Sequence, residues 1–199
     1  MKSNLLATTL VVALMSVATP AMAQDDNAFD GAWVGATGGY DGFDAGADTD
    51  AEDGFVYGIA LGYDFDLGGV LVGAEIEATD SSVKATAADI LEDGDELSLS
   101  VGRDLYAGVR IGVPLSDTVL AYAKAGYTNQ RFSASYTFDD ETMSVSENMD
   151  GYRLGAGVEL DLGAPFGRIE YRYSGYGRFS DADLETSRHQ LMLTAGMRF

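Results

Sequence analysis

The sequence predicts an all-β chain that forms an eight-stranded, antiparallel up-and-down transmembrane barrel. Three observations predict this fold: a hydropathy period of two in eight segments, connections that alternate between short and long, and one continuous apolar face on the predicted strands. The 199 residues include 25 glycines, 3 prolines and no cysteine, which suits glycine-rich strands and excludes disulfide scaffolds and thiolate metal sites.

The charge balance excludes one large class of partner. With 32 acidic and 12 basic residues the formal charge is −20, so phosphate backbones would be repelled and no nucleic-acid partner is expected. At 46% hydrophobic and 11% aromatic residues, however, the chain buries enough surface to fold.

The N-terminal segment is typical of a secretory signal peptide. Lys2 precedes an apolar run from Leu5 to Ala18, and Ala21-Met22-Ala23 is a small-x-small cleavage site. The run is too short for a membrane-spanning helix, which needs roughly 20 residues. We therefore assign residues 1–23 to a signal peptide and residues 24–199 to an exported barrel domain.

The eight predicted strands follow in order along the mature chain. They cover Gly31–Tyr40, Phe55–Phe65, Val70–Ala78, Leu97–Val113, Val119–Phe132, Gly151–Leu162, Arg168–Ser174 and His189–Phe199.

The connections between these strands alternate in length. Short turns fall at Asp66–Gly69, Pro114–Thr118 and Gly163–Gly167, whereas long polar links fall at Asp41–Gly54, Thr79–Glu96, Ser133–Asp150 and Gly175–Arg188. Outer-membrane barrels have short periplasmic turns and long extracellular loops. The long links hold twenty acids, Asp41 among them, and apart from Arg188 at the end of the last link only Lys84 and Arg178 as bases, so we expect acidic extracellular loops.

One strand face is hydrocarbon and the other is ionic. In the fourth strand Leu105, Val109 and Ile111 share a face, opposite Asp104 and Arg110. A soluble barrel would turn the charges to water, but the signal peptide and the loop alternation favour lipid outside and an ionic lumen. The predicted lumen ion pairs involve Glu75, Glu77, Arg110, Lys124, Arg153, Glu159, Arg168, Glu170 and Arg172.

Strand adjacency predicts how these charges pair. We expect Glu75 and Glu77 on the third strand to pair with Arg110 on the fourth. A second cluster should contain Arg153, Glu159, Arg168 and Glu170.

Two arginines depart from the pattern that places charged residues on the lumen face and apolar residues on the outer face. Arg103 shares the parity of Leu105, and Arg131 shares that of Tyr127, so both should point outward at the outer interface. Adjoining strands would place them side by side, where a lipopolysaccharide phosphate could bind between them. The alternatives are independent snorkelling, or a bulge that turns Arg103 inward.

Four short motifs carry a family resemblance: Gly31-Ala32-Trp33-Val34-Gly35, Gly62-Tyr63-Asp64-Phe65, Ala123-Lys124-Ala125-Gly126-Tyr127 and Met197-Arg198-Phe199. With them the mature chain resembles small eight-stranded outer-membrane barrels of the opacity-protein and OmpA-like superfamily, as in alphaproteobacterial porin-family proteins. The resemblance implies that Phe199 is the recognition signal for the barrel-assembly machinery. It also implies the outer membrane as location. The chain departs from full-length OmpA by ending with its last strand, so we expect no peptidoglycan-binding domain and no cell-wall tether.

The functional expectation is a structural barrel that supports the envelope and mediates surface interactions. An eight-stranded barrel is filled by side chains, so a narrow ion channel is the alternative and a wide pore is not. We expect a monomer without cofactor or metal. Asp48–Asp53 resembles the start of a calcium loop but lacks glycine at its sixth place and glutamate at its twelfth.

A lipid A-modifying enzyme is the other alternative. His189 is the one histidine, and Ser187 shares its strand face, which is the minimal requirement for a nucleophile and base. His189 shares the parity of Leu191, however, so it should face lipid, and no carboxylate is placed to orient it. We therefore expect no enzymatic activity.

Overall fold

The computed structural model describes residues 28–44, 52–88, 95–138, 141–176 and 186–199, and these ranges form nine β-strands. The predicted signal peptide and most of the calcium-loop-like segment lie outside these ranges. The strands are β1 (Gly31–Asp44), β2 (Glu52–Asp66), β3 (Leu71–Ser81), β4 (Lys84–Ala88), β5 (Glu96–Ser116), β6 (Val119–Phe138), β7 (Glu141–Asp161), β8 (Pro165–Tyr176) and β9 (Thr186–Arg198).

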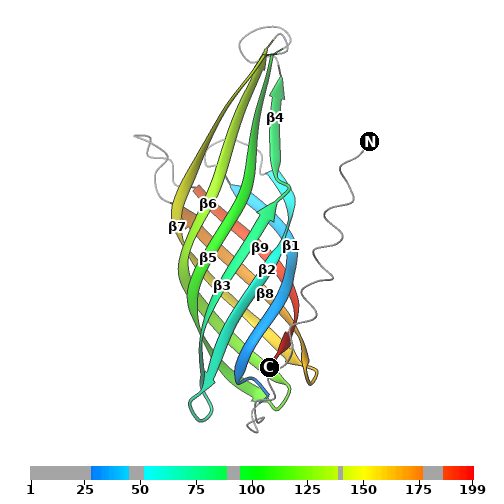
Figure 1. Cartoon of the computed structure of the whole chain (residues 1–199), viewed down its shortest axis with the longest axis vertical. Helices are drawn as coiled ribbons and strands as arrows, with labels where there is room; N and C mark the ends of the chain where they lie inside the picture. Colours follow the sequence, from blue (N-terminus) through cyan, green and yellow to red (C-terminus); the bar gives the residue numbers. More distant parts are fainter. Residues whose placement is uncertain (1–27, 45–51, 89–94, 139–140, 177–185) are drawn as a thin grey trace.

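The strands close into a barrel, as Figure 1 shows. Every neighbouring pair is antiparallel, β1 pairs with β9, and pairing of β3 with β5 closes the ring. Because β3 and β4 pair with successive parts of β5, they are two pieces of one wall strand, interrupted at Ser82 and Val83. The wall therefore contains eight strands, and the predicted fold class is confirmed.

The three short turns lie together at one end of the barrel (Figure 1). In the first, Gly68 and Gly69 have φ values of 85° and 100°, a region that favours glycine, and both amides donate to the Asp66 carboxylate. Gly163, with φ 99°, serves the turn between β7 and β8. The predicted alternation of turns and long links is thus confirmed at this end.

The long links are shorter than the sequence predicted, most of all the third. Residues 133–150 were expected to form a loop, but β6 continues to Phe138 and β7 begins at Glu141. The period-two pattern continues through this segment, and Ser133 faces Ser146 with their hydroxyls 2.9 Å apart. A β-hairpin replaces the expected loop.

The upper parts of β4, β5, β6 and β7 rise beyond the other strands (Figure 1). We call this part the protruding sheet. It consists of β4, the start of β5 as far as Val101, the end of β6 from Phe132 and the start of β7 that pairs with it. Its register places Leu99, Ala134 and Val145 in one row, and Ser98, Ser135 and Ser144 in the next. One face is therefore apolar and continues the lumen side, while the other carries hydroxyls.

The turn end of the lumen is closed by apolar side chains. Phe29 lies just before β1 and packs with Leu71 and Leu120, all three with at most 1% exposure. Arg198 donates to the carbonyl oxygen of Phe29 over 2.6 Å, which fixes the chain entering β1. Within the described ranges, no helix is long and apolar enough to cross a membrane.

Candidate functional site: the barrel lumen and outer wall

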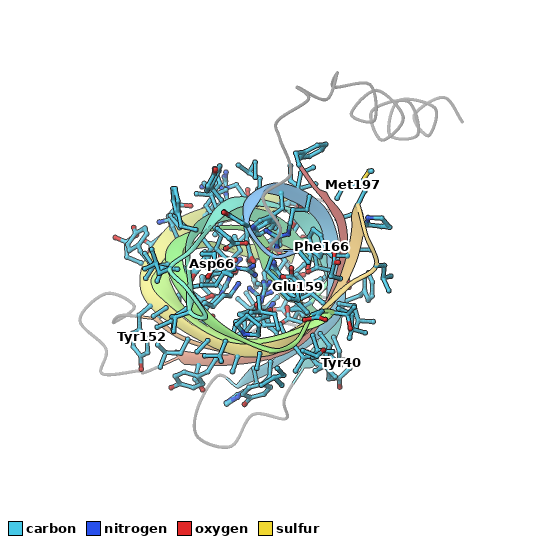
Figure 2. All side chains as sticks on the ribbon, turned by 90° about the horizontal axis from the view of Figure 1, so that it is seen from below. Tyr40, Asp66, Tyr152, Glu159, Phe166 and Met197 are labelled. Carbon is cyan, nitrogen blue, oxygen red and sulfur yellow. The ribbon has the colours of Figure 1, made fainter. Side chains whose placement is uncertain are left out.

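Strand alternation separates two environments. In β3 the burial alternates residue by residue, with Leu71, Glu75 and Glu77 buried and Val72 and Ile76 exposed. Figure 2 shows the same division around the ring: Glu159 and Phe166 project inward, whereas Tyr40 and Tyr152 project outward. The predicted assignment of charges to the lumen and hydrocarbon to the outside matches this arrangement.

The cluster nearest the turns joins three arginines to two carboxylates. Arg110 donates from Nε to Asp64 over 2.6 Å and from Nη1 to Glu159 over 3.0 Å. Arg168 and Arg198 each reach Glu159, at 2.7 and 2.6 Å, and Arg198 also reaches Asp64 at 2.9 Å. Opposite charges thus satisfy one another where water is excluded.

Aromatic rings support this lower cluster. The guanidinium of Arg168 lies 4.3 Å from the centroid of the Trp33 ring, and that of Arg110 lies 5.1 Å from the Tyr122 ring. Trp33 packs edge-on against Phe166. The rings therefore fill the space between the guanidinium groups.

The middle cluster is centred on Lys124. Its Nζ lies 2.6 Å from Glu75, 2.8 Å from Glu77 and 2.9 Å from Glu170, and all four side chains are at most 1% exposed. Arg172 bridges Glu77, at 2.8 Å, and Glu170. The cluster holds three carboxylates against two cations.

Glycine on the strand between two long side chains lets them meet. Gly155 of β7 lies between Lys124 and Arg172 in the register, and a Cβ there would be 3.0 Å from Lys124 Cγ. Gly73 separates Asp64 from Arg110 in the same way, because a Cβ would be 2.1 Å from the Asp64 carboxylate. The inward glycines thus make room for charge.

The upper cluster closes the end of the lumen that lies opposite the short turns. Asp104 accepts from Arg153, from Arg188 at 3.0 Å and from the Thr128 hydroxyl at 2.6 Å. Arg188 also binds both oxygens of Asp41, which accepts from Ser81 as well. Each of these charged groups therefore has at least one charged partner.

The three clusters form one chain of charge, which we call the lumen network. Two longer contacts join them, Arg168 to Glu75 at 3.6 Å and Arg153 to Glu77 at 3.7 Å. Its acids are Asp41, Asp64, Glu75, Glu77, Asp104, Glu159 and Glu170, and its bases are Arg110, Lys124, Arg153, Arg168, Arg172, Arg188 and Arg198. Seven acids cancel seven bases, so the chain's charge of −20 lies outside the lumen.

The structure places all nine predicted lumen residues in this network but corrects their pairing. Glu75 and Glu77 bind Lys124, while Arg110 binds Asp64 and Glu159, because the register sets Arg110 opposite Gly73 and Glu75 opposite Gly108. The prediction from strand adjacency did not take this register offset between β3 and β5 into account.

The expected second cluster is also divided between partners. Arg168 meets Glu159 as expected, but Arg153 binds Asp104 and Glu170 binds Arg172 and Lys124. Long side chains reach past the neighbouring strand, so the nearest charge along the sheet is not always the partner.

Sequence reasoning missed the pair formed by Asp41 and Arg188. Asp41 was assigned to an acidic loop, yet it is fully buried and belongs to β1, and Arg188 belongs to β9. The parity was a usable signal, because Asp41 shares the face of Thr37, and Arg188 shares that of Gln190. The first predicted strand stopped just before Asp41 and the last began just after Arg188, whereas β1 runs to Asp44 and β9 begins at Thr186.

The outer wall is apolar, with aromatic side chains near the edge that lies opposite the short turns. Exposed residues there include Tyr40, Tyr57, Tyr127, Tyr152 and Tyr171, at 52 to 55% exposure. Aromatic residues gather at membrane interfaces because their rings are apolar and their hydroxyls are wet. These tyrosines therefore form an aromatic belt of the kind found at a membrane interface.

His189 lies in this belt and faces outward, as predicted. Its Nδ1 is 2.7 Å from the Tyr171 hydroxyl, and its ring packs against Tyr173. Within the described part of the chain, no carboxylate contacts this histidine. The group that would orient a catalytic imidazole is therefore not supplied by these residues.

Arg103 and Arg131 are both exposed on the outer wall, on neighbouring strands β5 and β6. A bulge does lie at Arg103, between the pairs Val101–Phe132 and Asp104–Gln130, but it leaves the side chain outside. Phe199 follows β9, is 44% exposed, and donates its amide to the Ala32 carbonyl oxygen over 2.8 Å.

Across the described ranges, no group of three or more His, Asp or Glu side chains is placed to hold a metal ion. The acids of the lumen network already contact arginine or lysine. No residue of the described barrel was predicted to bind a cofactor.

Comparison with known proteins agrees with the closed barrel. Neisserial surface protein A superposes with a TM-score of 0.58 at 15% identity, over 84% of this chain and 97% of that chain. Ail, the attachment invasion locus protein of Yersinia pestis, crystallised with the heparin analogue sucrose octasulfate, gives 0.53 at 16% identity, over 85% and 99%. At such identities these likenesses show the fold alone, and a search of curated protein sequences gave no match.

A family model provides the stronger result. The model for an outer membrane protein beta-barrel domain matches residues 9–199, nearly the whole chain, including every strand described above. With its closed eight-stranded wall, apolar exterior and ionic lumen, the chain belongs to the outer membrane protein beta-barrel family.

Proposed function

We propose that this protein is a structural component of the outer membrane that also presents an acidic surface to partners outside the cell. The observation that supports the structural role is the lumen network, which fills the barrel from the apolar seal at Phe29 to Asp41 near the opposite end. A path for solutes would require buried ion pairs to separate, and breaking one such pair costs about 3 to 5 kcal/mol.

Export and assembly follow the usual route for this class of protein. Residues 1–23 direct export, and Phe199 at the end of the last strand is the signal read by the barrel-assembly machinery. The barrel then works as a monomer without cofactor or catalytic group. The support for a non-enzymatic role is the setting of His189, which contacts Tyr171 and Tyr173 in the lipid-facing belt.

The surface role belongs to the protruding sheet. Leu99, Met143 and Val145 are 52, 75 and 66% exposed, so the sheet offers apolar side chains outside the membrane. Exposed apolar patches of this kind are typical of interaction sites. Because the lumen is neutral and the chain as a whole carries −20, the partner we propose is a cationic surface. A polyanion such as the ligand in the Ail crystal would be repelled.

Planar bilayers test the structural role. Purified protein is first shown to be a folded barrel by its gel mobility before and after boiling, and is then inserted into bilayers under voltage. We expect no discrete conductance steps from the parent protein. Regular steps from folded protein would instead establish the narrow ion channel.

A hairpin deletion tests the surface role. Replacing residues 133–146 by a short turn removes the top of β6 and β7 but leaves the barrel pairs from Phe132 to Glu147 and below intact. We expect cells with this variant to keep their resistance to detergent and to lose adhesion to cationic surfaces. Unchanged adhesion would refute the surface role, and equal detergent sensitivity of cells with and without the full protein would refute the structural one.

A further inference from the structure

The lumen network leaves very few cations elsewhere. Outside the lumen, the described ranges contain only Lys84, Arg103 and Arg131 as basic residues. Lys84 lies on β4 in the protruding sheet, whereas the two arginines lie on the outer wall of adjoining strands. In a chain with such an acidic exterior, two neighbouring arginines facing the membrane call for an explanation.

The register brings the two arginines together. Val101 pairs with Phe132 and Asp104 pairs with Gln130, so Gly102 and Arg103 of β5 together face Arg131 of β6. Two residues opposite one is a β-bulge. Bulges redirect side chains, and here Arg103 and Arg131 both remain exposed on the outer face.

The lumen network holds this bulge in place from inside. Gln130 is fully buried, and its Nε2 donates to the carbonyl oxygens of Gly102, at 2.6 Å, and Arg103, at 3.2 Å. Its Oε1 in turn accepts from Arg188, which is anchored by Asp41. The backbone that carries Arg103 is therefore positioned by a buried side chain.

The arginines lie at the level of lipid headgroups. Below Arg103, β5 presents Leu105, Val109 and Ile111 to lipid, and below Arg131, β6 presents Tyr127 of the aromatic belt. Arg131 lies four positions beyond Tyr127 on β6, which corresponds to about 13 Å along the strand axis. At this interface an outward arginine costs only about 0 to 1 kcal/mol.

Neither arginine has an ionic partner among the residues that the structure describes. Asp150 lies on the same outer face, opposite Asn129, but it accepts from the Tyr127 hydroxyl and, at 2.7 Å, from Asn129 Nδ2. Two unpaired like charges on neighbouring strands repel each other, and an anion between them removes the repulsion. Guanidinium groups bind phosphate oxygens in a bidentate manner, which suits a phosphate approached from two sides.

We propose that Arg103 and Arg131 form a binding site for the phosphorylated headgroup of an outer-leaflet lipid. The ligand is a phosphate group at the outer interface, with its oxygens facing both guanidinium groups and its acyl chains along the apolar wall below Arg103. The inference rests on the barrel lying in the outer membrane.

Native mass spectrometry of detergent-purified protein tests the site. The parent, the double variant Arg103→Gln/Arg131→Gln and the control Lys84→Gln are each incubated with bisphosphorylated lipid A, dephosphorylated lipid A or phosphatidylglycerol. Lys84→Gln removes one positive charge from β4, outside the pair formed by Arg103 and Arg131. We expect the double variant to retain at least about tenfold less bisphosphorylated lipid A than the parent and the control.

The incubations with the other lipids identify the source of the phosphate, and a separate measurement detects variants that fail to fold. Equal binding of phosphatidylglycerol would assign the site to lipid phosphate in general, and weaker binding would assign it to lipid A. Gel mobility before boiling reports folding separately, and the single variants serve if the double variant does not fold. Equal retention by parent and double variant, or equal retention of dephosphorylated lipid A by the parent, would overturn the site.

Discussion

Lys124 is the position at which the lumen network is most sensitive to a single change. Its ammonium group lies within 2.9 Å of three carboxylates, so Lys124→Met leaves Glu75, Glu77 and Glu170 with Arg172 and two longer contacts. Removing one partner of a buried ion pair costs about 3 to 5 kcal/mol, because the remaining charge stays buried. With a urea dependence of about 2 kcal/mol per molar, the unfolding midpoint should fall by roughly 1.5 to 2.5 M.

The assay is urea unfolding of the barrel in lipid vesicles. The folded fraction is measured by gel electrophoresis of unboiled samples, in which the folded barrel migrates differently from boiled protein. The control is Lys84→Met, which removes an exposed lysine from β4 and should stay within about 0.5 kcal/mol of the parent. Adding Glu75→Gln to Lys124→Met should recover part of the lost stability, because Lys124 is the nearest cation to Glu75. A midpoint for Lys124→Met equal to that of Lys84→Met would refute the view that the network stabilises the barrel.

Three further outcomes are expected. Arg110→Met should lower the same midpoint by a similar amount, because Arg110 neutralises two buried carboxylates, and an unmoved midpoint would show that the lower cluster adds no stability. Gly126→Ala should destabilise the barrel by about 1 to 3 kcal/mol, because its Cβ would lie 2.4 Å from the Ala107 carbonyl oxygen. Gly167→Ala is the control, since a Cβ there meets nothing within 4 Å. Equal unfolding midpoints of these two variants would contradict the prediction. Phe199→Ala should reduce the amount of folded barrel in outer-membrane fractions while Phe199→Tyr preserves it, and equal yields would exclude an aromatic assembly signal.

The strands and their faces could be predicted from the sequence because alternation is a local property. From Gly73 to Thr79 the burial of β3 alternates as its hydropathy alternates, and no knowledge of the neighbouring strand is required. The turns were equally local, since Asp66, Gly68 and Gly69 form theirs with their own backbone and side chains.

Strand ends were less predictable. The sequence between Phe132 and Asp150 is polar enough to suggest a loop, but alternation continues there and pairing with the neighbouring strand extends both β6 and β7. Asp41 was misplaced for the same reason, because a single acid at the end of a strand carries no local sign that the side chain of Arg188 on β9 reaches it. Backbone pairing across strands decided both cases.

The sequence by itself determined that this chain is a barrel with an apolar exterior and a charged interior. The tertiary structure decided which charges meet. Asp41 and Arg188 lie 147 residues apart, and Lys124 reaches Glu75 on one side and Glu170 on the other, each two strands away. Such partners depend on the stagger of each strand pair, on the closure of the ring and on the glycines that clear a path across the lumen. These are properties of the assembled barrel, so alternation along a single strand does not encode them.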